Sequence, residues 1–145
     1  MINLKRKKTL KKPMNKKILI ADDTENTRKL IHFVLQKEGY DVTDVPDGAA
    51  ALEKIEKEHF DLVILDISMP EVDGFSVTLQ MRKTEKTKNI PILISTGHTR
   101  LKELFMLHAI AKFDDFIEKP FRASLLREKV NKLISGGKSV SEHTE

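Results

Sequence analysis

The chain has 145 residues, of which 39% are apolar and 33% charged, a balance typical of one soluble globular domain. It contains no cysteine, which excludes disulfide bonds, thiolate metal sites and cysteine nucleophiles. Its longest apolar runs, such as residues 62–65, are too short to cross a bilayer, and no secretory signal follows the amino-terminal lysines. We therefore expect a cytoplasmic protein without a membrane span.

The net charge of +4 is unevenly distributed along the chain. Residues 1–17 contain eight basic residues and no acidic one, whereas the remaining 18 basic and 22 acidic residues give the rest a net charge of −4. The basicity therefore belongs to a tail, and we expect no direct nucleic-acid binding by the folded domain. We predict a basic, disordered leader over 1–15, a folded domain over 16–135 and a polar tail over 136–145.

The role of the leader is open. We favour a solvated segment without specific function over an electrostatic tether for an acidic partner, a nucleic acid or an anionic membrane. Translation from Met14 is a further alternative, because the sequence that follows it begins directly with the first predicted strand.

From Lys17 onward, short apolar runs alternate with stretches of helical periodicity. We predict strands over residues 17–21, 40–45, 61–66, 92–95 and 116–117. We predict helices between Thr24, which can cap the first one, and Gly39, around 51–55, and over 75–83, 100–109 and 122–134. Five strand-then-helix units predict the α/β class, a doubly wound sheet of five parallel strands with helices on both faces.

Polar residues stand where the predicted strands end. Asp22 and Asp23 follow the first strand, Asp66 ends the third and Thr96 follows the fourth, while Lys119 comes just after the fifth. Because the carboxyl ends of parallel strands share one edge of a sheet, where such folds bind their ligands, we expect these five side chains to converge.

Three carboxylates at one edge repel one another unless a proton or a cation relieves the repulsion. Mg²⁺ favours a few carboxylates, several waters and a phosphate, and the lysine and threonine offer a positive charge and a hydroxyl for an anion. A carboxylate in such a site can attack phosphorus and form an acyl phosphate. We expect Asp66 to be this nucleophile, since it stands alone at the end of the most buried strand, and the paired Asp22 and Asp23 to hold the metal.

These residues lie in motifs that resemble the receiver domain of bacterial two-component response regulators, the CheY-like family. The motifs are Ile18–Asp23, Leu62–Pro70, Asp73-Gly74, Ser95–Gly97 and Phe116–Phe121. The resemblance runs from about Lys16 to Ile134. It implies a (βα)₅ flavodoxin-like fold and a role in phosphorelay signal transduction. A sensor histidine kinase or a histidine phosphotransfer protein would phosphorylate the domain, which would then switch a surface that binds a downstream target protein or output domain.

The resemblance also assigns the metal and acceptor residues one by one. Asp66 matches the phosphoacceptor, and Asp23 matches a direct Mg²⁺ ligand. Asp22 matches the second acidic residue, which commonly reaches the metal through water. The backbone carbonyl of Ser68 matches a further metal ligand, beside Asp66 itself.

The other matched positions concern the phosphoryl group and the switch. Thr96 resembles the hydroxyl residue that turns toward the phosphate, and Lys119 the lysine that contacts it. Phe116 occupies the aromatic switch position, and the resemblance implies a cis bond before Pro120. Lys112 and its neighbour Phe113 depart from the Gly-Ala that many members have there.

Two other functions are alternatives to this one. An aspartate-nucleophile phosphatase or phosphotransferase is the main alternative, but the haloacid-dehalogenase type has a second Asp two residues after its nucleophile, where this chain has Ser68. A nucleotide or flavin module is disfavoured because Asp22 and Asp23, rather than a glycine-rich loop, follow the first strand. We expect a phosphoacceptor that catalyses only its own phosphorylation and dephosphorylation, either stand-alone or excised from a larger regulator.

Overall fold

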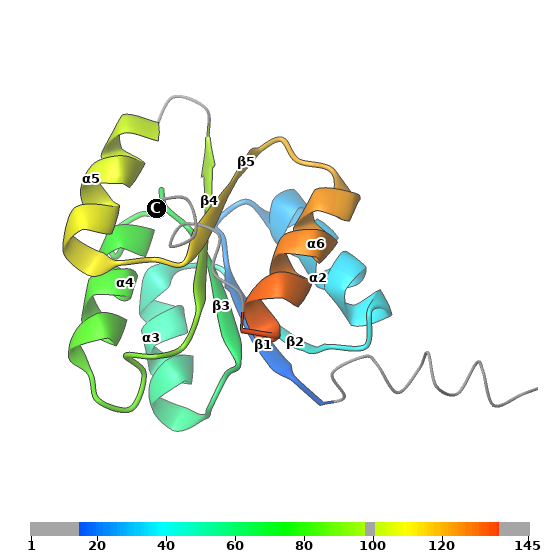
Figure 1. Ribbon diagram of the computed structural model, residues 1–145, viewed down its shortest axis with the longest axis horizontal. Helices are drawn as coiled ribbons and strands as arrows, with labels where there is room; N and C mark the ends of the chain where they lie inside the picture. Colours follow the sequence, from blue (N-terminus) through cyan, green and yellow to red (C-terminus); the bar gives the residue numbers. More distant parts are fainter. Residues whose placement is uncertain (1–14, 98–100, 137–145) are drawn as a thin grey trace, which may run out of the picture.

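The computed structural model describes residues 15–97 and 101–136, which form five strands and five helices in alternation (Figure 1). The strands are β1 (Lys17–Ala21), β2 (Asp41–Val45), β3 (Leu62–Asp66), β4 (Ile92–Gly97) and β5 (Asp115–Lys119). The helices are α2 (Glu25–Lys37), α3 (Gly48–Lys57), α4 (Gly74–Lys83), α5 (Leu101–Ala111) and α6 (Ala123–Ile134). Apart from Asn15 and Gly136, the leader and the tail predicted from the sequence lie outside the described residues.

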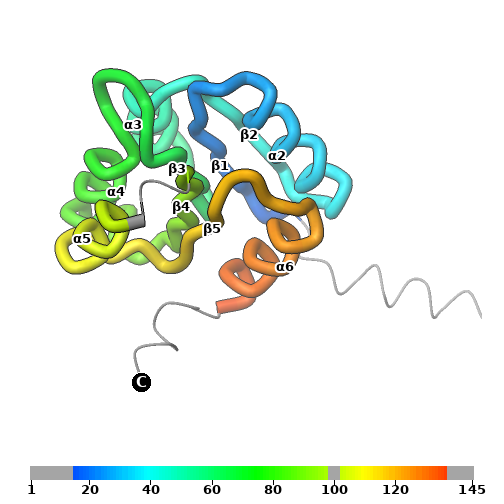
Figure 2. The backbone as a smooth tube through the Cα atoms, turned by 90° about the horizontal axis from the view of Figure 1, so that it is seen from above, coloured from blue at the N-terminus to red at the C-terminus, as the bar shows by residue number. Residues whose placement is uncertain are grey.

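The five strands form one parallel sheet in the order β2-β1-β3-β4-β5. Helices α2 and α6 cover one face of the sheet, and α3, α4 and α5 cover the other, as the view from above shows (Figure 2). The α/β fold predicted from the alternation of strands and helices is confirmed. All carboxyl ends of the strands therefore lie at one edge, which is the upper edge in Figure 1.

The strands at the centre are buried on both faces. In β1, Ile18 and Ile20 pack toward α2 and α6, while Leu19 and Ala21 pack toward α3, α4 and α5. All five residues of β3 are buried, which explains its almost unbroken apolar sequence. Within the described residues, no helix has the length and apolar character needed to cross a membrane.

The ends of the first helix follow from local backbone chemistry. Thr24 is the N-cap of α2, as predicted, but its side chain makes no capping hydrogen bond. Its backbone N–H instead donates to Oδ1 of Asp22 at 2.8 Å, which ties the start of the helix to the end of β1. At the other end Gly39 has a φ of 100°, a left-handed conformation that glycine adopts without a steric penalty.

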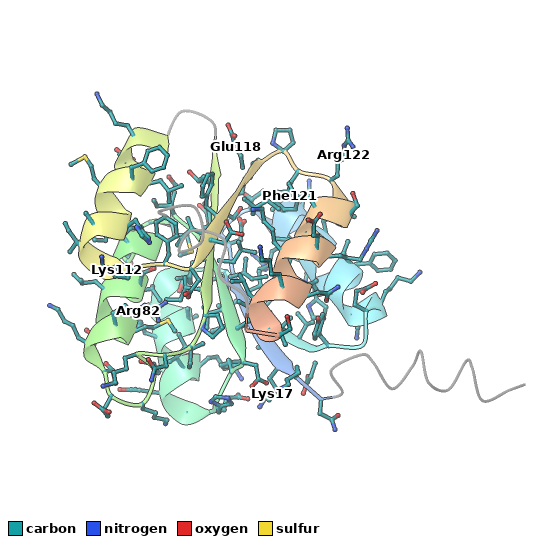
Figure 3. The ribbon with its side chains drawn as sticks, in the orientation of Figure 1. Lys17, Arg82, Lys112, Glu118, Phe121 and Arg122 are labelled. Carbon is teal, nitrogen blue, oxygen red and sulfur yellow. The ribbon has the colours of Figure 1, made fainter. Side chains whose placement is uncertain are left out.

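Two side chains, those of Arg82 and Tyr40, make contacts at the opposite, amino edge of the sheet. Arg82 on α4 donates to the main-chain oxygens of Lys112 and Ile90, each at 2.8 Å, and pairs with the buried carboxylate of Asp114 at 2.9 Å (Figure 3). Tyr40, the only tyrosine of the chain, is buried just before β2 and its hydroxyl donates to Oδ1 of Asn131 on α6. Burial, with a smaller effect of the nearby Glu38, raises the pKa of Tyr40 to about 12.

Candidate functional site

The acidic residues predicted from the strand ends lie together at the carboxyl edge of the sheet. Each of Asp22, Asp23 and Asp66 offers a carboxylate oxygen, and these oxygens lie within 4.8 Å of one another. Asp22 and Asp66 are 1% and 5% exposed, whereas Asp23 is exposed. Residues 44 positions apart in the sequence thus form one cluster because β1 and β3 are neighbours in the sheet.

Lys119 reaches the same cluster from the end of β5. Its Nζ atom lies 3.1 Å from Oδ2 of Asp22 and 3.4 Å from Oδ2 of Asp66. The connection that follows it, with Phe121 and Arg122, runs along this edge toward α6 (Figure 3). The Lys119–Pro120 peptide bond is cis, as the resemblance implied.

The environment of Asp66 disfavours its charged form. Burial, reinforced by the negative charge of Asp22, raises the pKa of Asp66 to about 6. The positive charge and hydrogen bond of Lys119 and the backbone N–H of Ser68, which donates to Oδ1 of Asp66 at 3.2 Å, oppose this rise. At neutral pH the acid is therefore still mostly ionised, and its buried charge is compensated only in part.

Asp22 has a buried carboxylate oxygen that bears on whether a metal ion fits the site. Its Oδ2 atom is buried and accepts no hydrogen bond within the described residues, and its contact with Lys119 is an ion pair without hydrogen-bond geometry. A buried carboxylate oxygen without a hydrogen bond is costly, and the single Lys119 ammonium, which also faces Asp66, compensates its charge only in part. The carboxylates of Asp22, Asp23 and Asp66 are hard oxygen ligands, and together they fit a divalent cation such as Mg²⁺.

The remaining predicted residues lie close to the edge but differ in what they contact. Thr96 is buried in β4, and its hydroxyl donates to the main-chain oxygen of Gly97 at 3.2 Å. Phe116 on β5 is half-buried and meets Phe105 of α5 in an edge-to-face contact, with the ring centroids 6.5 Å apart. Thr96 thus lies within β4, whereas Phe116 connects β5 with helix α5.

Gly74 shows how tightly the acceptor loop is packed. A Cβ atom at this position would lie 2.5 Å from the main-chain oxygen of Asp66, so only glycine fits without a backbone shift. Asp73, the N-cap of α4, accepts a hydrogen bond from the N–H of Ser76 at 2.8 Å and fixes the start of the helix. The Asp73-Gly74 motif is therefore explained by the close approach of α4 to the end of β3.

One residue that contacts the site, Arg28, was not predicted from the sequence. Arg28 on α2 donates through Nη1 to the main-chain oxygen of Asp22 at 2.8 Å and through Nε to Oδ1 of Asp44 at 3.1 Å. Its position six residues after Asp22 is the only sequence signal, and this spacing alone does not reveal the contact with β2.

Comparison with known proteins agrees with this geometry. The response regulator receiver domain family matches residues 18–131. The chain is 34% identical over 121 residues to chemotaxis protein CheY-3 of Vibrio cholerae, covering 83% of this chain and 92% of CheY-3. It is 36% identical over 116 residues to the CAI-1 autoinducer sensor kinase/phosphatase CqsS of Vibrio cholerae, covering 79% of this chain but only 17% of CqsS.

A solved structure shows the same likeness. The receiver domain of sensor histidine kinase PA1611 from Pseudomonas aeruginosa, which has a magnesium ion coordinated in its active site cleft, superposes with a TM-score of 0.77. It is 28% identical, and the match covers 84% of this chain and 99% of that structure.

The fold and its acidic edge define a phosphoacceptor domain of the CheY-like kind. The chain belongs to the response regulator receiver domain family, as its motifs predicted. Domains of this family take part in two-component signalling and bind Mg²⁺, and they occur both in response regulators and within sensor kinases.

Proposed function

We propose that Asp66 is the residue of this chain that accepts the phosphoryl group, with Mg²⁺ held by Asp22, Asp23, Asp66 and the backbone carbonyl of Ser68. The observation that carries the proposal is the convergence of three carboxylates within 4.8 Å with Lys119 in contact with two of them. Asp66 suits the acceptor role best because it is the acid at the end of the central, fully buried strand β3.

The phosphoryl transfer follows from the chemistry of these groups. A carboxylate oxygen of Asp66 attacks the phosphorus of a phosphohistidine, and an O–P bond forms as the P–N bond breaks, its electron pair returning to the imidazole nitrogen. Lys119 offers its charge to the phosphoryl oxygens that arrive beside Asp66. Bound Mg²⁺ would supply neutralisation of the charges on the phosphoryl oxygens and the carboxylates. Attack by water on the phosphorus later restores the carboxylate and releases phosphate.

Thr96 and Phe116 are proposed to pass the change to the surface. A phosphoryl group on Asp66 offers the Thr96 hydroxyl a stronger acceptor than the Gly97 oxygen that it contacts now. When Thr96 moves toward the phosphoryl group, the packing around Phe116 changes. The ring of Phe116 contacts Phe105 on α5, so this change reaches the surface of α5. The two states differ by one dianionic group, and phosphorylation shifts the population between them.

The proposed partners follow from this chemistry. The donor is a sensor histidine kinase or a histidine phosphotransfer protein, and the receiver of the signal is a downstream target protein or an output domain. The activity is limited to the domain's own phosphorylation and dephosphorylation, and a cytoplasmic location is part of the proposal. Turnover of small phosphate esters is not expected, because Ser68 offers no acid or base two residues after Asp66.

Incubation with acetyl phosphate and Mg²⁺, or with beryllofluoride and Mg²⁺, tests the assignment. Intact-mass analysis of the wild type should show one phosphoryl group, and Asp66→Asn should show none. Asp115→Asn is a matched control, since Asp115 is an equally buried carboxylate that pairs with Lys129 at 3.0 Å at the amino end of β5. Phosphorylation that persists in Asp66→Asn would refute the acceptor assignment.

A further inference from the structure

The carboxylate of Asp23 lies in the acidic cluster without side-chain contacts to other described residues that would hold it there. Asp23 is exposed, and among the described residues its side chain has no hydrogen-bond or ion-pair partner. Its oxygen nevertheless lies within 4.8 Å of those of Asp22 and Asp66. The position of this oxygen therefore depends on the rotamer of Asp23 and on the backbone from which it starts, which includes the peptide between Asp22 and Asp23.

Arg28 holds that peptide from outside the acidic cluster. Its Nη1 donates to the main-chain oxygen of Asp22 at 2.8 Å, and its Nε donates to Oδ1 of Asp44 at 3.1 Å. The side chain is only 13% exposed. Because the guanidinium is planar and its N–H groups have a fixed geometry, these two bonds set the direction of the Asp22 carbonyl.

The carboxylate of Asp44, which accepts the hydrogen bond from Arg28, is held in place by further contacts. It lies on β2 beside Ile20 of β1, with a side chain that is 11% exposed. Oδ2 contacts Nδ1 of His32, and Lys29 lies 3.7 Å from Oδ1. Burial acts to raise the pKa of Asp44, but the contacts with His32, Lys29 and Arg28 together lower it below its ordinary value. Asp44 is thus ionised at neutral pH and offers Arg28 a charged acceptor.

We propose that Arg28 is a positioning residue for the metal ligands: by joining the main-chain oxygen of Asp22 to the carboxylate of Asp44, it fixes the peptide that presents Asp23 to Mg²⁺. The inference rests on the proposed function, because it takes Asp22 and Asp23 as the metal ligands. Arg28 does not touch the metal or the phosphoryl group, and it acts only through the backbone.

Replacement of Arg28 should change the affinity for Mg²⁺ in opposite directions if Arg28 acts by positioning or only by its charge. Arg28→Met removes a positive charge near the acidic cluster, and by Coulomb's law alone this change would tighten Mg²⁺ binding. Loss of positioning has the opposite effect, because Asp23 would have to be ordered when the metal binds. Arg28→Lys keeps the charge but lacks the planar group that makes both bonds, so it should also weaken binding.

Calorimetric titration of the full chain with Mg²⁺, at one pH and ionic strength, measures this effect. We expect the Kd for Mg²⁺ to rise about tenfold in Arg28→Met and in Arg28→Lys, as is usual when a group that orients a metal ligand is lost. Asp44→Ala should act in the same direction, and the double variant with Arg28→Met should be no worse than either single one. Arg127→Met is the matched control, since this arginine of α6 is 41% exposed and lies 3.9 Å from Glu38.

Phosphorylation by acetyl phosphate gives a second measure. In Arg28→Met the Mg²⁺ concentration for half-maximal rate should rise with the Kd, while the rate at saturating Mg²⁺ stays within about twofold of the wild type. A general structural defect would lower the saturated rate instead.

The affinity of the Arg28 variants for Mg²⁺ either supports or contradicts the positioning role of Arg28. A folded Arg28→Met protein that binds Mg²⁺ as tightly as the wild type, or more tightly, overturns it. If Arg28→Met does not unfold cooperatively, Arg28→Lys decides in its place, and wild-type affinity in that variant is equally contradictory. Failure of the wild type itself to bind Mg²⁺ would instead refute the proposed function.

Discussion

The Nζ atom of Lys119 lies 3.4 Å from Oδ2 of Asp66, although 53 positions of sequence separate the two residues. The lysine side chain is 23% exposed and the aspartate side chain 7%. A partly exposed cation thus faces a buried acid, which it can compensate only in part. Lys119 thus opposes the effect of burial on the pKa of Asp66 and offers a positive charge to an arriving anionic group.

Replacement of Lys119 by methionine tests this relationship. We expect the pKa of Asp66 in the metal-free protein to rise above about 6, because the lysine charge opposes the effect of burial. We also expect phosphorylation by acetyl phosphate to slow by at least about tenfold, since a fixed charge beside the phosphoryl oxygens is lost. Carboxyl NMR titration and intact-mass time courses measure the two effects. Lys129→Met, which removes the partner of Asp115, should change neither.

The raised pKa of Asp66 predicts a pH-dependent stability of the metal-free protein. A carboxyl whose pKa rises from 3.8 to about 6 on folding favours the folded state while it is protonated, and this contribution is lost as the pH rises through 6. Asp66→Asn cannot ionise, so above about pH 7 it should be more stable than the wild type by up to about 3 kcal/mol. The difference should vanish below about pH 4, and urea unfolding at several pH values checks it. Equal stability of the two proteins at neutral pH would contradict the prediction.

Gly74→Ala should disturb the acceptor loop. The new Cβ atom would lie 2.5 Å from the main-chain oxygen of Asp66, so β3 and α4 would have to move apart. We expect a loss of about 2 kcal/mol in the free energy of unfolding together with slower phosphorylation. Gly97→Ala is the control for stability, since its Cβ atom would meet no atom of the described residues within 4 Å. Chemical unfolding of both variants should show a clear difference between them.

Arg82→Met should weaken the fold without affecting the site. The variant leaves the buried carboxylate of Asp114 without its arginine and removes donors from the main-chain oxygens of Lys112 and Ile90. We expect a loss of about 3 to 5 kcal/mol, the usual effect of breaking a buried pair from one side. If the variant still folds, its Kd for Mg²⁺ should equal that of the wild type, because Arg82 lies at the amino edge of the sheet. A changed metal affinity would show that the two edges are coupled.

Much of the site could be predicted because parallel strands bring their carboxyl ends to one edge. Asp22, Asp66 and Lys119 each follow or end an apolar run, and knowledge of the strand directions alone was enough to place them together. The roles of these residues in metal binding and phosphoryl transfer stay predictions until the experiments above are done.

The contacts that were not predicted depend on register and on helix orientation. Asp44 looks like an ordinary solvent-facing acid in a strand, and its bond to Arg28 requires β2 to pair with β1 so that Asp44 lies beside Ile20. Strand β5 was predicted over 116–117 only, but it extends from Asp115 to Lys119. Its charged residues obscured the apolar pattern, and the charge of buried Asp115 is compensated by Lys129, which no local pattern reveals.

The burial of Tyr40 under α6 has a practical consequence. The chain contains one tyrosine and no tryptophan, so its tyrosine fluorescence comes from a single phenol at the amino edge of the sheet. Emission from this ring should follow the separation of α6 from β2 during denaturation and stay nearly silent when an ion binds at the other edge. We therefore expect tyrosine fluorescence to report on the packing of α6 independently of ion binding at the carboxyl edge.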